Sequence, residues 1–244
     1  KVALAHRRLS IVDLTPRGHQ PIPNEARSVW LVANGEIYNA PELRSTLSAS
    51  GHVFRSGTDT EVILHGYEEW GEHVVHRLNG MFAFAIYDDR KQMLFCARDP
   101  FGIKPFYYQN DSVSCAFASE IKALLCLPGA TVIPDEESIN NYLNYTFPVT
   151  DKTWFKGIRQ LPPGSTLTVV KNRVSVTTYF RPESIQSTAE VSDEELYELL
   201  DQAVHSHLQS DVEVGFHLSG GLDSSGIVAL AAEQVGNIPV TFSG

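Results

Sequence analysis

The stretch MFAFAIYDD at Met81–Asp89 decides the fold of the larger part of this 244-residue chain. Its apolar, β-prone residues predict a strand, and a polar turn at Asp88–Gln92 leads into another apolar run at Met93–Ala97. Upstream, the run VWLVA at Val29–Ala33 predicts a further strand. Strands therefore dominate the pattern on both sides of the quoted stretch.

Outward from this hairpin, strands and a few helices fill the chain as far as Tyr179. The further predicted strands are Phe106–Gln109, Val113–Ala118, Thr166–Val170 and, after a turn at Lys171 and Asn172, Val174–Tyr179. The predicted helices are Pro41–Ser48, which starts with a proline suited to the first helical position, Thr60–Trp70 and Ile121–Leu125. Antiparallel strands with few helices predict an α+β domain of stacked sheets.

The pattern changes after Pro182. The polar segment Pro182–Ser192 is interpreted as a linker, and Ser192 with Glu195 forms a capping box that starts a helix. Apolar residues then recur at helical spacing, at Leu196, Leu199, Leu200, Ala203, Val204 and Leu208.

The last segment predicts a βαβ unit. Val212–Leu218 is strand-like, Asp223–Val235 has a helical pattern, and Ile238–Phe242 is β-prone, so a parallel sheet is expected. One such unit cannot bury both faces of a sheet. We therefore expect a first domain at residues 1–181, a linker at 182–192 and only the start of a second domain at 193–244.

Composition and charge narrow the class of function. The net charge of −10 argues against binding to duplex nucleic acid, and no apolar run approaches the roughly 20 residues that span a bilayer. The start KVALAHRRLS lacks the features of a signal peptide. The three cysteines, Cys96, Cys115 and Cys126, are an odd number without metal-ligand spacing, which argues against a disulfide framework and a structural zinc site. Cys96 and Cys115 lie in apolar, strand-like runs, which indicates buried free thiols. We expect a cytoplasmic protein with no nucleic-acid or membrane partner.

The segment SGGLDSS at Ser219–Ser225 lies between the strand and the helix of the βαβ unit. Gly220 and Gly221 allow a tight turn that brings backbone N–H groups against a ligand. The hydroxyls of Ser219, Ser224 and Ser225 add donors, and a helix N-terminus favours an anion. Asp223 would repel phosphate unless a cation lay between them, and Mg²⁺ is the natural choice.

This loop has a plainer interpretation as a glycine-rich turn capped by Asp223 or a serine. The whole segment nevertheless resembles the pyrophosphate-binding loop of the ATP pyrophosphatases, which cleave ATP to AMP and pyrophosphate. No lysine follows the glycines, so the loop is not of the Walker type. The resemblance covers the motif and about thirty flanking residues.

Four segments of the first domain resemble the glutaminase domain of the class II glutamine amidotransferases. They are HRRLSIVD at His6–Asp13, NGEIYN at Asn34–Asn39, SGTDTEV at Ser56–Val62 and RDPFGIKPFYY at Arg98–Tyr108. The resemblance implies a four-layer αββα fold of the N-terminal-nucleophile type, which agrees with the strand-rich pattern.

The residues themselves suit the recognition of glutamine. Arg8 can hold the α-carboxylate with two donors, and Asp59 and Glu36 can hold the α-ammonium group. Asn34 and the Gly35 N–H, expected at the end of the strand Val29–Ala33, can stabilise the oxyanion of an amide under attack. The resemblance implies the same roles and adds Leu9, Ile11 and Val12 as pocket residues.

Each of these residues has a plainer alternative. Arg8 can be a surface ion-pair residue, and Asn34-Gly35 is a good hairpin turn. Thr58 or Asp59 can simply cap the helix that begins near Thr60.

The class II family uses an N-terminal cysteine as nucleophile, whereas residue 1 here is Lys. We expect a chain truncated by a few tens of residues at its start, in which neither active site is complete. A degenerate amidotransferase without glutaminase activity is the alternative.

A class II glutaminase followed by an SGGLDSS loop resembles the layout of the glutamine-dependent asparagine synthetases. The resemblance implies that ammonia from glutamine passes to the second domain, where ATP and Mg²⁺ activate aspartate as β-aspartyl-AMP. It places pyrophosphate at Ser219, Gly220, Gly221, Asp223, Ser224 and Ser225, with Mg²⁺ at Asp223 and adenosine near Leu218. The aspartate site is expected beyond residue 244.

Three points remain open from the sequence. The same architecture with another carboxylate acceptor, such as a β-lactam-forming synthetase, is one alternative. A pseudo-amidotransferase that serves as a binding or regulatory module is the other. Synthetases of this layout are often homodimers, which the sequence does not decide.

Overall fold

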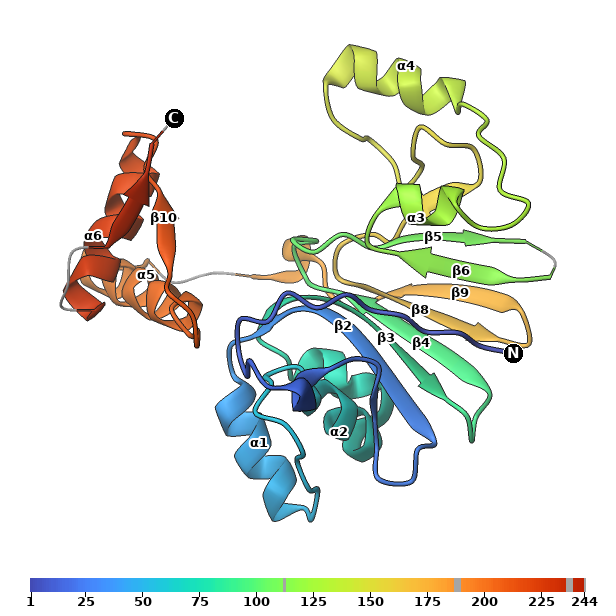
Figure 1. Cartoon of the computed structure of the whole chain (residues 1–244). Coiled ribbons are helices and arrows are strands. Elements are labelled where there is room, and N and C mark those ends of the chain that lie inside the picture. The colour runs from blue at the N-terminus through green and yellow to red at the C-terminus, as the bar shows by residue number, and fades with distance from the viewer. Residues whose placement is uncertain (112, 187–189, 236–238, 244) are drawn as a thin grey trace. The chain divides into compact units, whose positions relative to one another are not determined.

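The strand predicted at Met81–Asp89 lies in the larger of two antiparallel sheets in a computed structural model, which describes residues 1–111, 113–186, 190–235 and 239–243. This strand, β3 (Gly80–Asp88), pairs with β2 (Val29–Ile37) and with β4 (Met93–Arg98). The full order is β1-β2-β3-β4-β8-β9, with β1 at Ile22–Pro23, β8 at Ser165–Val170 and β9 at Arg173–Thr178 (Figure 1). The hairpin between β8 and β9 turns at Lys171 and Asn172, both with positive φ, as predicted.

A smaller antiparallel sheet packs on one face of the larger one. Its order is β6-β5-β7, with β5 at Tyr107–Asn110, β6 at Cys115–Ala118 and β7 at Ile158–Gln160. The core between the sheets joins Val32, Ala85 and Cys96 of the larger sheet to Tyr108 of β5 and to Phe106, which directly precedes β5. Cys96 is a fully buried free thiol, as predicted, whereas Cys115, also free, is only half-buried.

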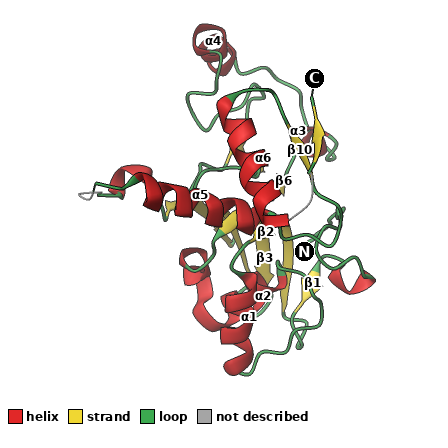
Figure 2. Ribbon diagram, turned by 90° about the vertical axis from the view of Figure 1, so that its left-hand side faces the viewer, coloured by secondary structure: helices red, strands yellow, loops and turns green. Residues whose placement is uncertain are grey.

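Helices cover the outer faces. The helices α1 (Ala40–Ala49) and α2 (Glu61–Trp70) lie side by side on the larger sheet (Figures 1 and 2) and enclose a second apolar core. On the other side, α3 (Ile121–Leu125) contacts β5 and β6, and α4 (Glu136–Tyr145) follows. Short 3-10 helices are η1 (Pro16–Gly18), η2 (Gly71–His76) and η3 (Pro182–Ser184). The layered α+β fold predicted from the sequence is confirmed.

The end of the chain forms the predicted βαβ unit. The helix α5 (Asp193–His207) precedes this unit, and its N-terminus has the predicted capping box of Ser192 and Glu195. The parallel strands β10 (Gly215–His217) and β11 (Val240–Phe242) flank α6 (Leu222–Val235). Leu196, Leu199 and Leu200 of the predicted apolar stripe are half or more exposed, and only Val204 of that stripe is buried.

The contacts divide the chain into two compact units. The larger unit comprises Lys1–Arg8, His19–Arg55 and Asp59–Ile185, and the smaller comprises Leu9–Gly18, Ser56–Thr58 and Gln186–Gly244. In the smaller unit, Asp13 Oδ2 accepts from Gly57 N at 2.6 Å and Asp13 N donates to Asp211 Oδ2 at 2.6 Å. Within the described residues, no helix combines the length and hydropathy needed to cross a bilayer.

Several predicted boundaries are wrong. The strand expected to end at Ala33 continues to Ile37, because β3 pairs with it residue by residue as far as Gly80. Asn34-Gly35 is therefore neither a strand end nor a hairpin turn. The strand expected at Val212–Leu218 shrinks to Gly215–His217, where its partner β11 has only three residues to pair with it. Ile238 of the predicted last strand and Ser187–Ala189 of the predicted linker lie outside the described residues.

Candidate active site

The candidate site begins on the edge of β2 that faces away from β3. In an antiparallel pair, the backbone groups of alternate residues point to the partner strand, and those in between point to the opposite edge. Just past the end of β2, Tyr38 N donates to Asn79 O at 2.8 Å, which assigns the even-numbered positions to the β3 side. The odd-numbered residues, including Gly35, therefore direct their N–H groups to the outer edge.

Side chains anchor this outer edge on both sides of Gly35. Ala33 N donates to Gln20 Oε1 at 2.6 Å, and Gln20 Nε2 returns a bond to Ala33 O at 3.0 Å. Two residues past Gly35, Ile37 N donates to Asp59 Oδ2 at 2.7 Å. The predicted oxyanion donor thus lies between two fixed points on an extended strand.

Gly35 also marks a close approach of β2 to β3. A Cβ at this position would lie 2.1 Å from Met81 O and 2.7 Å from Phe82 Cα. A Cβ on Gly80 would likewise lie 2.1 Å from Glu36 O. Backbone atoms in the middle of a sheet cannot move aside, so these positions require glycine.

Asp59 and Arg8 meet at the same edge. Burial raises the pKa of Asp59, while the N–H groups of Ile37 and Thr60 and the charge of Arg8 oppose that rise. The positive charge of Arg8 thus acts on the Asp59 carboxyl group. The N-cap residue of α2, Thr60, makes no capping hydrogen bond through its side chain. The Asp59 carboxylate binds the N–H of Ile37 on β2, a contact that the role of a simple helix cap does not explain.

Asn34 and Glu36 lie on the face of β2 that carries Val32. Because side chains alternate along a strand, both follow Val32 toward the smaller sheet, and both are half-buried. Burial raises the pKa of the nearby Tyr38 to about 12, and the negative charges of Glu36 and Asp99 add to the rise. The structure therefore brings Arg8, Asn34, Gly35, Glu36 and Asp59 to one end of the larger sheet.

Asp99 organises the neighbouring loop and was missed as an individual site residue. Its carboxylate is fully buried and accepts from Phe101 N at 3.1 Å and Ile103 N at 2.9 Å through Oδ1. Through Oδ2 it accepts from Lys104 N at 2.9 Å and Phe82 N at 3.3 Å. Asp followed by Pro-Phe-Gly is a turn signal that could have identified this role.

Arg98 supports the same loop from within the core. Its guanidinium donates to three backbone carbonyls, those of Lys104 at 2.7 Å, Gly102 at 2.6 Å and Leu161 at 2.7 Å. The Tyr179 hydroxyl donates to Arg98 O at 2.8 Å. Arg98 and Asp99 therefore hold the segment after β4 rather than offer free charges to a ligand.

The remaining predicted pocket residues belong to the smaller unit. Leu9 is 83% exposed, and Ile11 and Val12 are half-buried, with Ile11 O accepting from Asp211 N at 2.9 Å.

Among the cysteines, burial raises the pKa of Cys96 well above its usual value and that of Cys115 to about 11. Neither thiol is disposed to attack an amide, because the thiolate is the reactive form.

The predicted phosphate loop is an open turn between β10 and α6. Gly220 has φ of 78°, and a Cβ there would meet nothing within 4 Å. Ser219 Oγ lies 3.0 Å from Ser224 Oγ, and Ser225 N donates to Gly221 O at 3.1 Å to begin the helix. The loop therefore has the tight glycine turn and the hydroxyl groups expected from its sequence.

The donors of this loop fit an anionic ligand with a cation. Asp223 lies in the first turn of α6 and is exposed, as are Ser219 and Ser225. Leu218 is tied to β11, because its N–H donates to Phe242 O at 2.9 Å and its carbonyl accepts from Ser243 Oγ at 2.8 Å. The open space at Gly220 leaves room for a phosphate group against the backbone.

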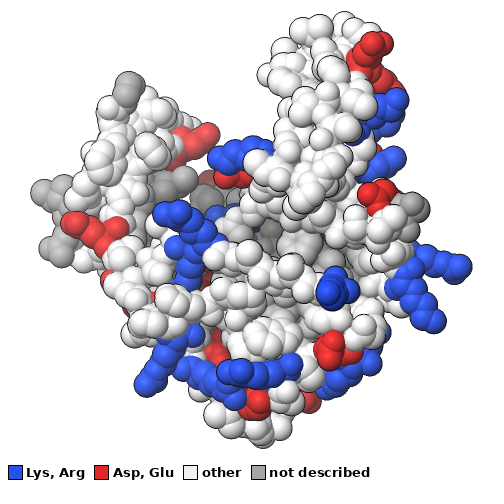
Figure 3. Space-filling model, turned by 45° about the vertical axis from the view of Figure 1, so that its right-hand side comes forward, with Lys and Arg blue, Asp and Glu red and all other residues white. Residues whose placement is uncertain are grey.

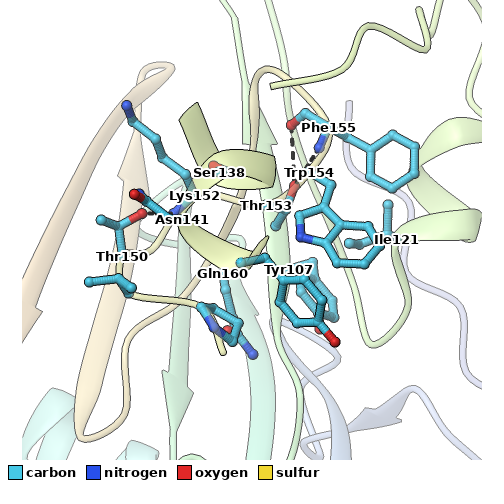
Figure 4. Close-up of a pocket in the computed structure, with 13 residues that line it drawn as sticks. Tyr107, Ile121, Ser138, Asn141, Thr150, Lys152, Thr153, Trp154, Phe155 and Gln160 are labelled. Atoms are coloured by element: carbon cyan, nitrogen blue, oxygen red, sulfur yellow. Dashed lines mark hydrogen bonds between the residues drawn. The ribbon is translucent and has the colours of Figure 1, made fainter. Parts of the chain in front are cut away.

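A separate pocket of about 190 Å³ opens between α4 and the segment Pro148–Phe155 (Figure 4). Its walls include Tyr142 and Trp154, whose rings meet edge to face at 4.9 Å. None of its described lining residues is among the catalytic or binding residues predicted from the sequence. On the face shown in Figure 3, Lys and Arg side chains lie in separate groups with Asp and Glu side chains among them.

Comparison with known proteins finds two family matches along the chain. Residues 1–180 match the family model described as a glutamine amidotransferase domain, and residues 195–244 match one described as asparagine synthase. The chain belongs to the glutamine amidotransferase domain family.

Two curated relatives come from Bacillus subtilis (strain 168). Glutamine-hydrolysing asparagine synthetase 3 is 40% identical over 251 residues, covering 99% of this chain and 41% of the relative. Glutamine-hydrolysing asparagine synthetase 1 is 38% identical over 235 residues, covering 95% of this chain and 37% of the relative. The chain thus spans about two fifths of the length of these relatives.

Among solved structures, the chain is similar to the glutamine phosphoribosylpyrophosphate amidotransferase of B. subtilis in complex with ADP and GMP. The identity is 19%, the TM-score is 0.47, and the likeness covers 92% of this chain and 48% of that one.

Proposed function

We propose that the full-length protein is a glutamine-dependent asparagine synthetase. The observation that carries the proposal is the order of the two family matches, an amidotransferase domain followed by the start of an asparagine synthase domain. Relatives that cover nearly all of this chain bear the name of that enzyme. The proposed reaction uses glutamine, aspartate and ATP as substrates.

In the first half-reaction, the edge of β2 binds glutamine and its reacting amide. The Arg8 guanidinium pairs with the α-carboxylate, and Asp59 and Glu36 hold the α-ammonium group. The Asn34 side chain and the Gly35 N–H donate to the oxygen of the amide as it becomes negative. Leu9, Ile11 and Val12 are proposed as apolar walls. The attacking nucleophile is not assigned to any of these 244 residues.

In the second half-reaction, the loop after β10 binds ATP. Ser219, Gly220, Gly221, Ser224 and Ser225 donate to the pyrophosphate end of the nucleotide, and Leu218 lies beside the adenosine. Asp223 is proposed to hold Mg²⁺, which when bound neutralises phosphate charge that the carboxylate would otherwise repel. The side-chain carboxylate of aspartate then attacks the α-phosphate of ATP, forming β-aspartyl-AMP and releasing pyrophosphate, and ammonia displaces AMP to form the amide.

The domain boundaries follow the same proposal. We place the glutaminase domain at residues 1–181, the linker at 182–192 and the start of the synthetase domain at 193–244. Free cysteines in apolar strands support a reducing, cytoplasmic location. Assembly as a homodimer is part of the proposal, on the likeness of the layout alone.

The test is release of AMP and pyrophosphate by the full-length protein with ATP, Mg²⁺ and glutamine, with and without aspartate. The proposal predicts AMP that depends on aspartate and appears with an equal amount of asparagine. AMP release that ignores aspartate would instead indicate the same chemistry on another carboxylate. Absence of AMP release under all these conditions would contradict the synthetase function.

A further inference from the structure

A cluster of two histidines and a glutamate lies on the helical side of the larger unit, away from the residues discussed so far. We call His52, His65 and Glu68 the His52 cluster. One ligand atom from each lies within 4.8 Å of the others. His65 is 1% exposed, His52 and Glu68 are half-buried, and the two imidazole rings have centroids 5.1 Å apart.

The cluster is built from two adjacent pieces of chain. His65 and Glu68 are three residues apart on α2, and His65 Nδ1 lies 3.2 Å from Glu68 Oε2. Residues at this spacing share one face of a helix and can bind one ion together. His52 comes from the segment after α1, and its Nε2 lies 3.2 Å from Glu69 Oε2.

Outer partners hold two of the three side chains in position. Asn24 Nδ2 donates to Glu68 Oε1 at 2.6 Å, so the other oxygen, Oε2, faces His65. On the far side of the His65 ring, Nε2 lies 3.6 Å from Glu61 Oε1, which also accepts from Arg55 N at 2.9 Å. A carboxylate behind the ligating histidine is the usual outer contact in protein metal sites, because it fixes the ring and its tautomer.

We propose that His52, His65 and Glu68 bind a divalent transition-metal ion, with Zn²⁺ as the expected ion. Two imidazoles and one carboxylate are a donor set that Zn²⁺ accepts, with water or Glu69 available as a fourth ligand. Bonds of about 2.0–2.2 Å in a tetrahedron place ligand atoms roughly 3.5 Å apart. His65 Nδ1 and Glu68 Oε2 are already near this spacing, at 3.2 Å. No two of the three ligand atoms lie more than 4.8 Å apart, so side-chain rotation needs to close about 1.3 Å at most.

Without an ion, the same residues form a buried group of charges. Although burial lowers the pKa of His65, the neighbouring carboxylates of Glu61 and Glu68 outweigh that effect and raise its pKa to about 9. A protonated His65 between carboxylates is thus the competing state. The metal ion replaces that proton, keeps the positive charge at the centre and adds His52 to the group.

The ion would clip the segment after α1 to α2. Only a few residues separate His52 from Asp59, so a bound ion would also restrict the segment that leads to Asp59, a proposed glutamine-binding residue. The proposal does not depend on the proposed function, because it concerns binding of an ion by a buried cluster.

The experiment measures Zn²⁺ binding by the full-length protein, freed of any affinity tag and stripped with a chelator, in competition with a chromophoric chelator. The His52→Gln variant is the main test, since glutamine is close to histidine in size and removes the imidazole ligand. We expect affinity at this site to fall tenfold or more in His52→Gln and in Glu68→Gln. The matched control is His73→Gln in η2, where His73 and His76 also have neighbouring rings, 6.0 Å apart.

Thermal unfolding supplies the second readout. Saturating Zn²⁺ is expected to raise the midpoint of the wild-type protein and of His73→Gln, and to leave that of His52→Gln unchanged. Zn²⁺ binding of equal strength in wild type and His52→Gln would overturn the proposal and leave a buried ion group only. Equal weakening in His52→Gln and His73→Gln would overturn it as well, because the binding would then be nonspecific.

Discussion

The edge of β2 and the loop after β10 are the two proposed ligand sites, and their backbones are built in opposite ways. At Gly35 the backbone is enclosed by β3 and fixed on either side by Gln20 and Asp59. At Gly220 the backbone turns with positive φ into open space. The first site is defined by packing, whereas the second is defined by its residue types, and equivalent substitutions should therefore have unequal costs.

The largest difference is expected from Gly35→Ala against Gly220→Ala. The first places a methyl group 2.1 Å from Met81 O and should lower the free energy of unfolding by about 3 kcal/mol or more. The second has only the cost of a left-handed backbone, about 1 kcal/mol. Denaturant unfolding of both variants measures the two costs, and equal values would contradict the view that only Gly35 is enclosed.

A smaller contrast is expected between two aspartates. Asp99→Asn leaves buried N–H groups facing an amide instead of a carboxylate, so we expect a loss of about 2 kcal/mol. Asp223→Asn alters an exposed side chain in the first turn of α6, with a cost of about 0.5 kcal/mol. The measurement is again the unfolding midpoint.

Asp111→Asn is the matched control for the buried aspartate. Asp111 is exposed and also accepts two backbone N–H groups, from Val113 and Ser114 at 2.7 Å each. If Asp99→Asn cost no more than Asp111→Asn, burial would not be the reason for the importance of Asp99.

The smallest effect is expected at the start of α5, in the smaller unit. Ser192→Ala removes half of the capping box and should lower stability by about 1 kcal/mol. Ser206→Ala, near the end of the same helix, removes only a bond from Oγ to Gln202 O and should change stability by less than about 0.5 kcal/mol. Comparison of the two thermal midpoints is sufficient, and an equal loss would exclude a specific role for the cap.

Local patterns predicted most of the elements but not the length of β2. The runs that became β3, β4, β8 and α2 have strong periodicity or clear turn residues. Asn34-Gly35-Glu36 looks like a turn because all three residues are poor strand formers. Pairing with β3 over the whole of Val29–Ile37 overrides that local preference. The helix α4 was missed because its sequence, EESINNYLNY, is mostly polar and only its cap at Asp135 marks its start.

The site was predicted as a set of residues rather than as a geometry. The roles proposed for Arg8, Asp59 and Gly35 rest on the sequence and stay predictions, whereas the anchoring of Ala33 by Gln20 depends on chain segments that meet only in the fold. The same limit applies to metal binding. Cysteine spacing argued against a structural zinc site, whereas the His52 cluster joins side chains from two elements and has no signature in the sequence.

If the edge of β2 and the loop after β10 perform separate steps, two full-length variants should lose different activities in paired assays. Arg8→Ala and Asp223→Ala are each measured for glutamine hydrolysis and for ATP cleavage with ammonia in place of glutamine. We predict that Arg8→Ala weakens glutamine hydrolysis and largely keeps ammonia-dependent ATP cleavage, while Asp223→Ala abolishes ATP cleavage and keeps glutamine hydrolysis. Equal loss of both activities in both variants would contradict the division of labour between the edge of β2 and the loop after β10.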